Sequence, residues 1–173
     1  PAIECLGGAI RSCTLTGHAE RAVWLTSGSV MSNCLVAGNG RGIDGNGSRI
    51  EHCVVAGNGL YGVMLGSSPS NNVVEHCTIV SNTGPGVYFS NNSGTLRDSV
   101  IAHNAASGDS FAGGVTGASL IDNCVIAGNT GAVGGVYLSS GLMRNTTIAD
   151  NASETCGGAF CFLGGMVNCI VYS

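Results

Sequence analysis

The chain contains little charge, few aromatic side chains and no lysine. Only 9% of its 173 residues are charged, and its six basic residues are all arginines. The net charge of −4 is spread without runs of one sign, so neither a nucleic-acid surface nor an anionic-membrane surface is indicated. No apolar run approaches the roughly 18 residues that a membrane-spanning helix needs, and we expect no membrane span.

The sequence also lacks the cysteine spacing of a zinc site, an initiator Met and a signal peptide. The nine cysteines include no CxxC pair, and no Gly-Gly-x-Gly-x-Asp calcium repeat occurs, so we expect no metal and no other cofactor. The chain starts at Pro1 without an initiator Met or a signal peptide, and it stops at Ser173 in mid-pattern. We therefore expect a processed product or a segment of a longer protein, with residues 1–173 forming one domain.

What the chain does contain is an internal repeat. Residues 50–59 carry it best: a large apolar residue, two polar residues, a small residue that is usually Cys, a β-branched pair and then an Asn. Altered copies occupy residues 31–40, 74–83, 96–105, 121–130 and 143–152, with degraded copies at 10–19 and 166–173. A period of about 22 residues indicates a stacked repeat architecture.

Two columns appear when the copies are aligned. The small central residues are Cys13, Cys34, Cys53, Cys77, Ser99, Cys124, Thr146 and Cys169. The asparagines are Asn39, Asn58, Asn82, Asn104, Asn129 and Asn151. We expect the cysteines in the core, because Cys is among the most buried residue types. We expect the asparagines to form a ladder of side-chain amides at one turn, in the left-handed conformation that Asn tolerates.

A second short apolar segment follows each asparagine, as at residues 23–25, 63–65, 87–89 and 136–138. Its alternation has a period of two, which is typical of strands, whereas helical spacing is absent. A unit this short cannot bury its own apolar side, so copies have to stack coil on coil. The sequence therefore predicts an all-β fold, a β-solenoid of about seven to eight coils, with variable loops at residues 66–72 and 105–113.

These features resemble the right-handed parallel β-helix superfamily, of the pectate-lyase-like kind. Residues 134–138 followed by 145–151, and residues 167–173, carry the resemblance best, and it covers nearly the whole chain. The chain is most similar to the Gly- and Asn-rich repeats of large bacterial surface proteins, which implies an extracellular or cell-surface location. The resemblance is specific for fold alone, because this fold hosts lyases, hydrolases, phage spikes, adhesins and fibres.

A polar stripe just before the Cys column holds the candidates for catalysis. Enzymes with this fold place acidic residues, often with Arg or Lys, on one outer face. The nearest counterparts here are Glu51, His52, Glu75, His76 and Asp98. Stacking would set Glu51 over Glu75 and His52 over His76, and neighbouring His and carboxylate groups can serve general acid–base catalysis. The alternative, which we favour, is a solvated turn that keeps the solenoid soluble.

Two outward surfaces are candidates for contacts. Beside the Cys column, alternate positions from Thr14 to Ile170 and from Thr16 to Tyr172 form a flat, small and almost uncharged face. The bulky outward residues of the second segment are Trp24, Met64, Tyr88, Tyr137 and Phe160. An apolar stripe of this length usually marks a contact surface. An aromatic row can also bind sugars, and long loops folding over the row are the alternative.

Neither end of the repeat carries a recognisable cap. The chain opens on a second segment and closes on a first segment, so the start of one copy could complete the last coil of another. The residues expected at this end-to-end contact are Ile3, Cys5, Ala159, Cys161, Ile170 and Tyr172. Across the junction, Cys5 and Cys161 would either form a disulfide or remain buried thiols.

Three functional hypotheses follow. The regular repeat and sparse charge favour a non-enzymatic structural protein whose partner is itself, stacked head to tail into a fibre or surface filament. A heterologous contact that does not close on itself gives such an open filament. The second hypothesis is a carbohydrate-active domain, a polysaccharide lyase or hydrolase or a glycan-binding module. The third is a spacer segment within a giant adhesin.

Overall fold

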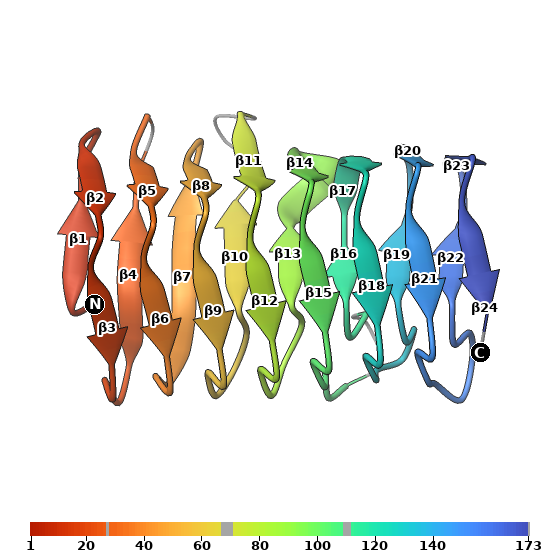
Figure 1. The fold of residues 1–173 in the computed structure, drawn as a ribbon, viewed down its shortest axis with the longest axis horizontal. Helices are drawn as coiled ribbons and strands as arrows, with labels where there is room; N and C mark the ends of the chain where they lie inside the picture. The colour runs from red at the N-terminus through yellow and green to blue at the C-terminus, as the bar shows by residue number, and fades with distance from the viewer. Residues whose placement is uncertain (27, 67–70, 109–111, 173) are drawn as a thin grey trace.

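Three long parallel β-sheets wind into one solenoid in the computed structural model, which describes residues 1–26, 28–66, 71–108 and 112–172 (Figure 1). Strands of successive coils lie side by side along the long axis. The predicted all-β solenoid is confirmed, and η1 (Ser90–Asn92), a 3-10 turn, is the one helical element in the described part of the chain. Residues 67–70 and 109–111, within the two expected loops, lie outside the described residues.

Each sheet contains eight strands, one from each coil. Sheet A consists of β1 (Ile3–Cys5), β4 (Arg21–Leu25), β7 (Arg41–Asn46), β10 (Val63–Gly66), β13 (Val87–Phe89), β16 (Val115–Thr116), β19 (Val136–Leu138) and β22 (Ala159–Cys161). Sheet B consists of β2 (Ala9–Arg11), β5 (Val30–Ser32), β8 (Arg49–Glu51), β11 (Asn72–Glu75), β14 (Gly94–Arg97), β17 (Ala118–Asp122), β20 (Leu142–Arg144) and β23 (Gly165–Val167). Sheet C consists of β3 (Thr14–Thr16), β6 (Leu35–Ala37), β9 (Val54–Ala56), β12 (Thr78–Val80), β15 (Val100–Ala102), β18 (Val125–Ala127), β21 (Thr147–Ala149) and β24 (Ile170–Tyr172).

The coils stack in register, which sets like residues above one another. In sheet C, Val55 pairs with Ile79 and Ile79 pairs with Ile101, and all three are buried. Parallel strands lie about 4.8 Å apart, so each inward column becomes a continuous apolar row, and the rows of the three sheets form the core. The period-two alternation is confirmed in β10, where Val63 is buried and Met64 is exposed.

A left-handed residue separates sheet B from sheet C in every coil. In the best copy of the repeat, β8 ends at Glu51, His52 has a φ of 52°, and β9 begins at Val54. The equivalent residues of the other coils also have positive φ: Ser12, Asn33, His76, Asp98, Asn123, Asn145 and Asn168. Short polar side chains tolerate this conformation best. The repeat alone leaves open whether a coil has two or three short strands. The corner divides the segment around the Cys column into two strands, so each coil has three.

The cysteine column lies just inside this corner and makes hydrogen bonds as well as apolar contacts. The thiols of Cys53 and Cys77 donate to the carbonyl oxygen two residues earlier, at 3.3 and 3.1 Å. Ser99 and Thr146 occupy the same column, and their hydroxyls donate to the equivalent carbonyls at 2.7 and 2.8 Å. Burial raises the pKa of the Cys124 thiol to about 12, which keeps it protonated as a donor. The column therefore requires a small side chain with a donor, and Cys, Ser and Thr all meet that requirement.

The predicted asparagine ladder is confirmed, from Asn39 to Asn151. From Asn39 to Asn129, each side-chain amide donates to the amide oxygen of the next coil, as from Asn82 Nδ2 to Asn104 Oδ1 at 2.8 Å. The left-handed conformation expected for these asparagines is wrong. It belongs to the residue before each one, such as Ser81 with a φ of 57°, because the chain has to bend before the amide can point into the coil.

Replacing Asn104 with Ala should destabilise the solenoid. Asn104 Oδ1 accepts the backbone and side-chain amides of Asn82, and Asn104 Nδ2 donates to Ile79 O and Asn129 Oδ1. The substitution leaves several of these buried groups unpaired, at roughly 1–3 kcal/mol each, so we expect a loss of about 3 kcal/mol or more. Urea unfolding measures it. Asn71→Ala, at an exposed position outside the strands, is the control, and equal losses in both variants would contradict the proposed role of the ladder.

Candidate functional site

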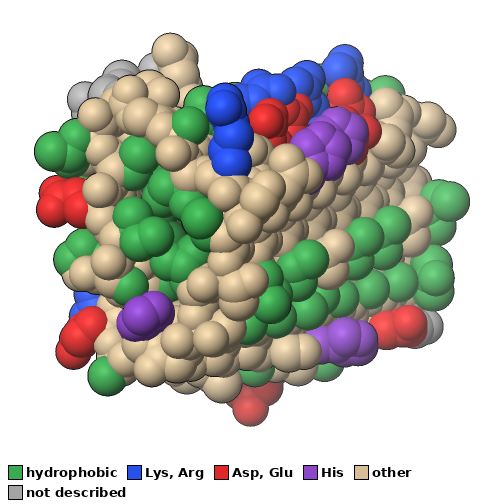
Figure 2. All heavy atoms as spheres, turned by 60° about the vertical axis from the view of Figure 1, so that its left-hand side comes forward, with side chains coloured by type: hydrophobic (Ala, Val, Ile, Leu, Met, Phe, Trp, Pro, Cys, Tyr) green, Lys and Arg blue, Asp and Glu red, His purple; other side chains and the backbone are tan. Residues whose placement is uncertain are grey.

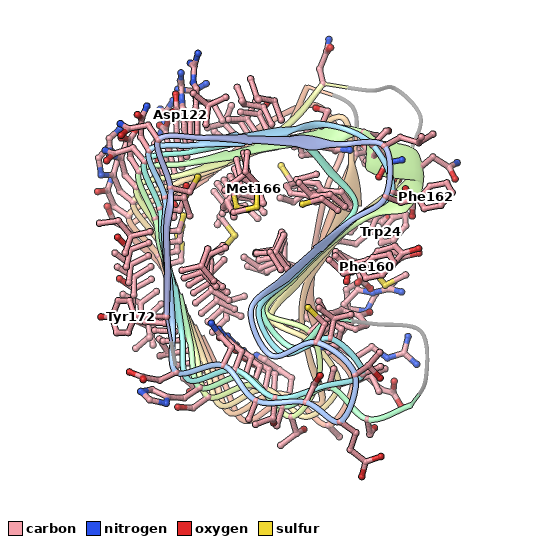
Figure 3. All side chains as sticks on the ribbon, turned by 90° about the vertical axis from the view of Figure 1, so that its right-hand side faces the viewer. Trp24, Asp122, Phe160, Phe162, Met166 and Tyr172 are labelled. Carbon is pink, nitrogen blue, oxygen red and sulfur yellow. The ribbon has the colours of Figure 1, made fainter. Side chains whose placement is uncertain are left out.

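The outward row of sheet A lies in an indentation of the solenoid. Viewed along the long axis, the ring of strands bends inward on this side, and Trp24 and Phe160 lie in the bend (Figure 3). Register pairs Trp24 with Asp44, Asp44 with Met64, and Met64 with Tyr88. The row continues with Thr116, Tyr137 and Phe160. The predicted outward row is therefore one continuous line along the molecule.

Three hollows follow one another along this row. Trp24 and Met64 line one of them, Met64 and Tyr88 line the next, and Tyr88 and Tyr137 line the third. Neighbouring hollows share a lining residue, Met64 or Tyr88, so they follow one another from Trp24 to Tyr137. This series of hollows is hereafter the sheet A groove. The structure thus brings together four of the five residues predicted for lateral or glycan contact, and Phe160 extends the row beyond Tyr137.

An ion pair supports the tryptophan at one end of the groove. Arg21 Nε pairs with Asp44 Oδ2, and the Asp44 side chain is only 4% exposed. The guanidinium carbon of Arg21 also lies 4.6 Å from the centre of the Trp24 ring, in a cation–π contact. Arg21 is therefore held between a carboxylate and an aromatic face, and this fixes the orientation of the ring. Among the described residues that line the three hollows, Asp44 is the one carboxylate.

The other end of the groove combines an aromatic floor with a hydrogen-bonded wall. The rings of Tyr137 and Phe160 stack with centroids 5.5 Å apart and an interplanar angle of 2°. Asn92, at the end of η1, donates Nδ2 to Ser139 Oγ at 2.8 Å, and that hydroxyl donates to Asn92 Oδ1 at 2.9 Å. An apolar floor with a few fixed polar groups is the usual composition of a ligand site.

Sequence reasoning did not identify Arg21, Arg41, Leu60 or Tyr61, which line the groove beside the row. Strict alternation would put Arg21 on the same side as Val23, inside the coil. Leu60 and Tyr61 precede β10, where no strand alternation applies. No periodic signal in the sequence therefore points to these residues.

The catalytic candidates lie elsewhere, at the end of sheet B and the corner that follows it. Glu51 and Glu75 are register partners, as predicted, but the side chain of Glu75 is only 2% exposed. Arg49 and Arg97 both pair with Glu75, and Arg49 Nε lies 2.7 Å from Glu51 Oε2. The two arginines offset the repulsion between the stacked carboxylates.

These ion pairs hold the outer carboxylates in their charged form. The hydrogen bond from Arg49 lowers the pKa of Glu51 below its ordinary value. Hydrogen bonds from Arg144, and secondarily from Asn145, lower the pKa of Asp122 in the same way. A general acid at neutral pH needs a raised pKa, so these carboxylates suit salt bridging better than proton donation.

The two candidate histidines stack on the outer surface of the corner. The ring centroids of His52 and His76 are 4.8 Å apart at an interplanar angle of 4°, and His76 Nε2 lies 3.9 Å from Asp98 Oδ2. Figure 2 shows basic, acidic and histidine side chains gathered along one edge of the molecule. The structure brings the five candidates close to one another but not to the sheet A groove, whose three hollows contain none of them.

The residues expected at an end-to-end contact lie in the first and last coils. Those that are partly buried against the ends of the core are Ile3, Cys5, Ala159 and Cys161. Ile170 and Tyr172 point outward from sheet C, and Val171 between them points inward. Among the described residues, no three His, Cys, Asp or Glu side chains are grouped as a metal site requires, and no helix has the length and apolarity to cross a membrane.

Comparison with known proteins establishes the family. The chain belongs to the family described as the right handed beta helix region, whose model matches residues 3–125 and 46–173. The crystal structure of the Agl-KA catalytic domain is similar, with a TM-score of 0.63 and 15% identity over 96% of this chain and 42% of that chain. The chain thus spans less than half the length of that protein, and likeness at this identity shows the fold alone. No curated protein matches the chain significantly.

The ion pairs of sheet B should make stability depend on pH in the acid range. The folded-state pKa values of Glu51 and Asp122 are lowered, so their pairs stabilise the fold above the ordinary carboxyl pKa of about 4. That stabilisation is lost as the pH falls through the lowered values. We expect the thermal midpoint, followed by circular dichroism, to fall between about pH 5 and pH 2, and to fall less in Glu51→Gln. Glu154→Gln, at an exposed carboxylate, is the control, and identical pH profiles for Glu51→Gln and the parent would refute this assignment.

Proposed function

We propose that this chain is a glycan-binding β-helix domain that holds a polysaccharide along the sheet A groove. The succession of hollows along one row of side chains, from Trp24 to Tyr137, carries the proposal. An extended polymer lying there would meet one coil about every 4.8 Å. Aromatic side chains offer apolar faces for sugar rings, and the polar groups at the groove edge offer partners for hydroxyls. An extracellular or cell-surface location belongs to the same proposal, since such polymers surround cells.

The proposed activity is binding without cleavage. Glycoside hydrolysis ordinarily uses two carboxylates about 5–9.5 Å apart, on either side of the scissile bond. In the part of the chain that the structure describes, the groove lining offers one carboxylate, Asp44, and Arg21 neutralises it. Glu51 and Glu75 are adjacent to each other but lie on sheet B. The Agl-KA protein is described as a catalytic domain, so cleavage is the alternative outcome of the experiment below.

The single tryptophan of the chain makes the binding experiment selective. Trp24 lines the groove, so its fluorescence should change when a polysaccharide binds there and not when one binds elsewhere. We expect at least one member of a panel of neutral and acidic polysaccharides to shift the emission, with no release of reducing ends. Tyr137→Ala should weaken that binding about tenfold, which corresponds to about 1.4 kcal/mol.

Val167→Ala, which removes an exposed side chain from sheet B, is the matched control and should bind like the parent. The proposal fails if no polysaccharide alters the emission or produces heat in calorimetry, or if Tyr137→Ala binds as tightly as the control. Release of reducing ends would convert the assignment to an enzyme.

End-to-end stacking of copies into a filament is a second proposal, and the apolar surface of the last coil favours it. Phe162 is 70% exposed, Leu163 76% and Val171 48%. The strands of the first and last coils also have one unpaired edge each, and such edges readily pair with another strand. Association through two different surfaces leaves each new copy with one open end, so growth would continue. In a spacer segment of a larger adhesin, a further coil of the same chain would cover this surface instead.

Light scattering over a range of concentrations tests the stacking. We expect the average mass to rise without a plateau, and Leu163→Asp, which places a charge on the last coil, to suppress this growth. Leu60→Asp, at an exposed apolar residue of the groove, is the control and should assemble like the parent. A mass that does not change with concentration would rule out the filament.

A further inference from the structure

The outer face of sheet C carries no charge along its whole length. Its two outward rows run along the long axis, where Figure 2 shows rows of hydrophobic side chains. The first row is Thr14, Leu35, Val54, Thr78, Val100, Val125, Thr147 and Ile170. The second row is Thr16, Ala37, Ala56, Val80, Ala102, Ala127, Ala149 and Tyr172. A sheet face of this size without charge is unusual for a surface that meets only water.

The two rows differ in height, so the face has a ridge and a furrow. In the first row, Val54 is 42% exposed and Val125 is 43% exposed. In the second row, Ala102 is 8% exposed and Ala149 is 4% exposed. The larger residues of the first row form the ridge, and the alanines of the second row form the furrow beside it.

We infer that this face binds the same face of a second copy, about a two-fold axis parallel to the long axis of the solenoid. This operation reverses the strand direction between the copies, so the ridge of each copy enters the furrow of the other. Five coils then pair a larger residue with an alanine. Val125, for example, meets the partner's Ala127, and Val54 meets the partner's Ala56. One surface supplies both complementary shapes, as an isologous contact requires.

The spacing of the rows favours a second copy over an unrelated partner. Both copies repeat at the spacing of parallel strands, about 4.8 Å, so every coil finds its counterpart at once. The turn of a partner helix repeats at about 5.4 Å and would lose register within a few coils. The face is about 35 Å long and, from the His52 corner to the Asn58 turn, about 20 Å wide. Two such faces would bury about 1,400 Å² together, within the range of stable interfaces.

The contact leaves the proposed binding site open. Sheet C and the indented side of sheet A lie on different sides of the ring, with Tyr172 outside the one and Trp24 in the bend of the other (Figure 3). The dimer would therefore present two parallel grooves to the same polymer network, and its affinity for a polymer would exceed that of a single copy. The dimerisation itself does not depend on the glycan proposal.

Sedimentation equilibrium tests the contact, on variants in which residues of the ridge and of the furrow are substituted or exchanged. In Leu163→Asp, whose end-to-end stacking is suppressed, we expect the mass to approach twice the chain mass of 17.2 kDa and to stop there. In that background, Val125→Glu should raise the dimer dissociation constant at least about tenfold. Ala127→Val should also weaken the dimer several-fold, because two valines then collide. The double exchange of Val125→Ala with Ala127→Val should restore it, because a valine again faces an alanine.

Met64→Glu, at a residue 39% exposed on sheet A, is the matched control and should dimerise like its parent. Circular dichroism confirms that each variant keeps its strand content. A monomer at all concentrations overturns the inference, and so does an equal effect of Val125→Glu and Met64→Glu. A tighter dimer in Ala127→Val would show that general stickiness, and not the ridge and furrow, drives association, and would equally overturn it.

Discussion

The whole structure depends on in-register stacking of its coils at the spacing of parallel strands. The buried asparagine ladder enforces this register, because the amide oxygens from Asn58 to Asn151 accept hydrogen bonds from both the backbone and the side chain of the preceding asparagine, as Asn104 does from Asn82. A shift by one residue would leave these buried groups unpaired and turn the apolar rows outward. The cysteine column adds a second set of short-range bonds at the opposite end of sheet C.

The same constraint explains why the three outer faces differ so much. Inward positions are fixed by the core, so only outward rows are free to vary, and stacking converts any variation into a stripe along the molecule. On sheet A the stripe is aromatic and lies in an indentation. On sheet B it is a network of ion pairs around the buried Glu75. On sheet C it is small and uncharged. We propose a different contact for each stripe: a polymer on sheet A, water on sheet B and the sheet C of a second copy on sheet C.

Much of the fold could be predicted from the repeat, because its period specifies both the coil and the side on which each residue lies. The row from Trp24 to Phe160 and the stacking of His52 on His76 follow from alignment of the copies alone. The left-handed corners were assigned to the wrong residue, since aligned columns show which positions match but not where the backbone bends. The ion pair between Arg21 and Asp44 was not foreseen, because it joins different columns of neighbouring coils.

The sequence by itself determined that the coils stack, which residues form the core and which rows face outward, because these depend on periodicity. Only the tertiary structure decided the curvature of each face. The inward bend places the aromatic row of sheet A in an indentation, whereas sheet C stays flat and leaves its valines and alanines on a level outer face. Curvature arises from the turns between the sheets, where the repeat varies and where side chains such as Tyr61 approach from outside the aligned columns.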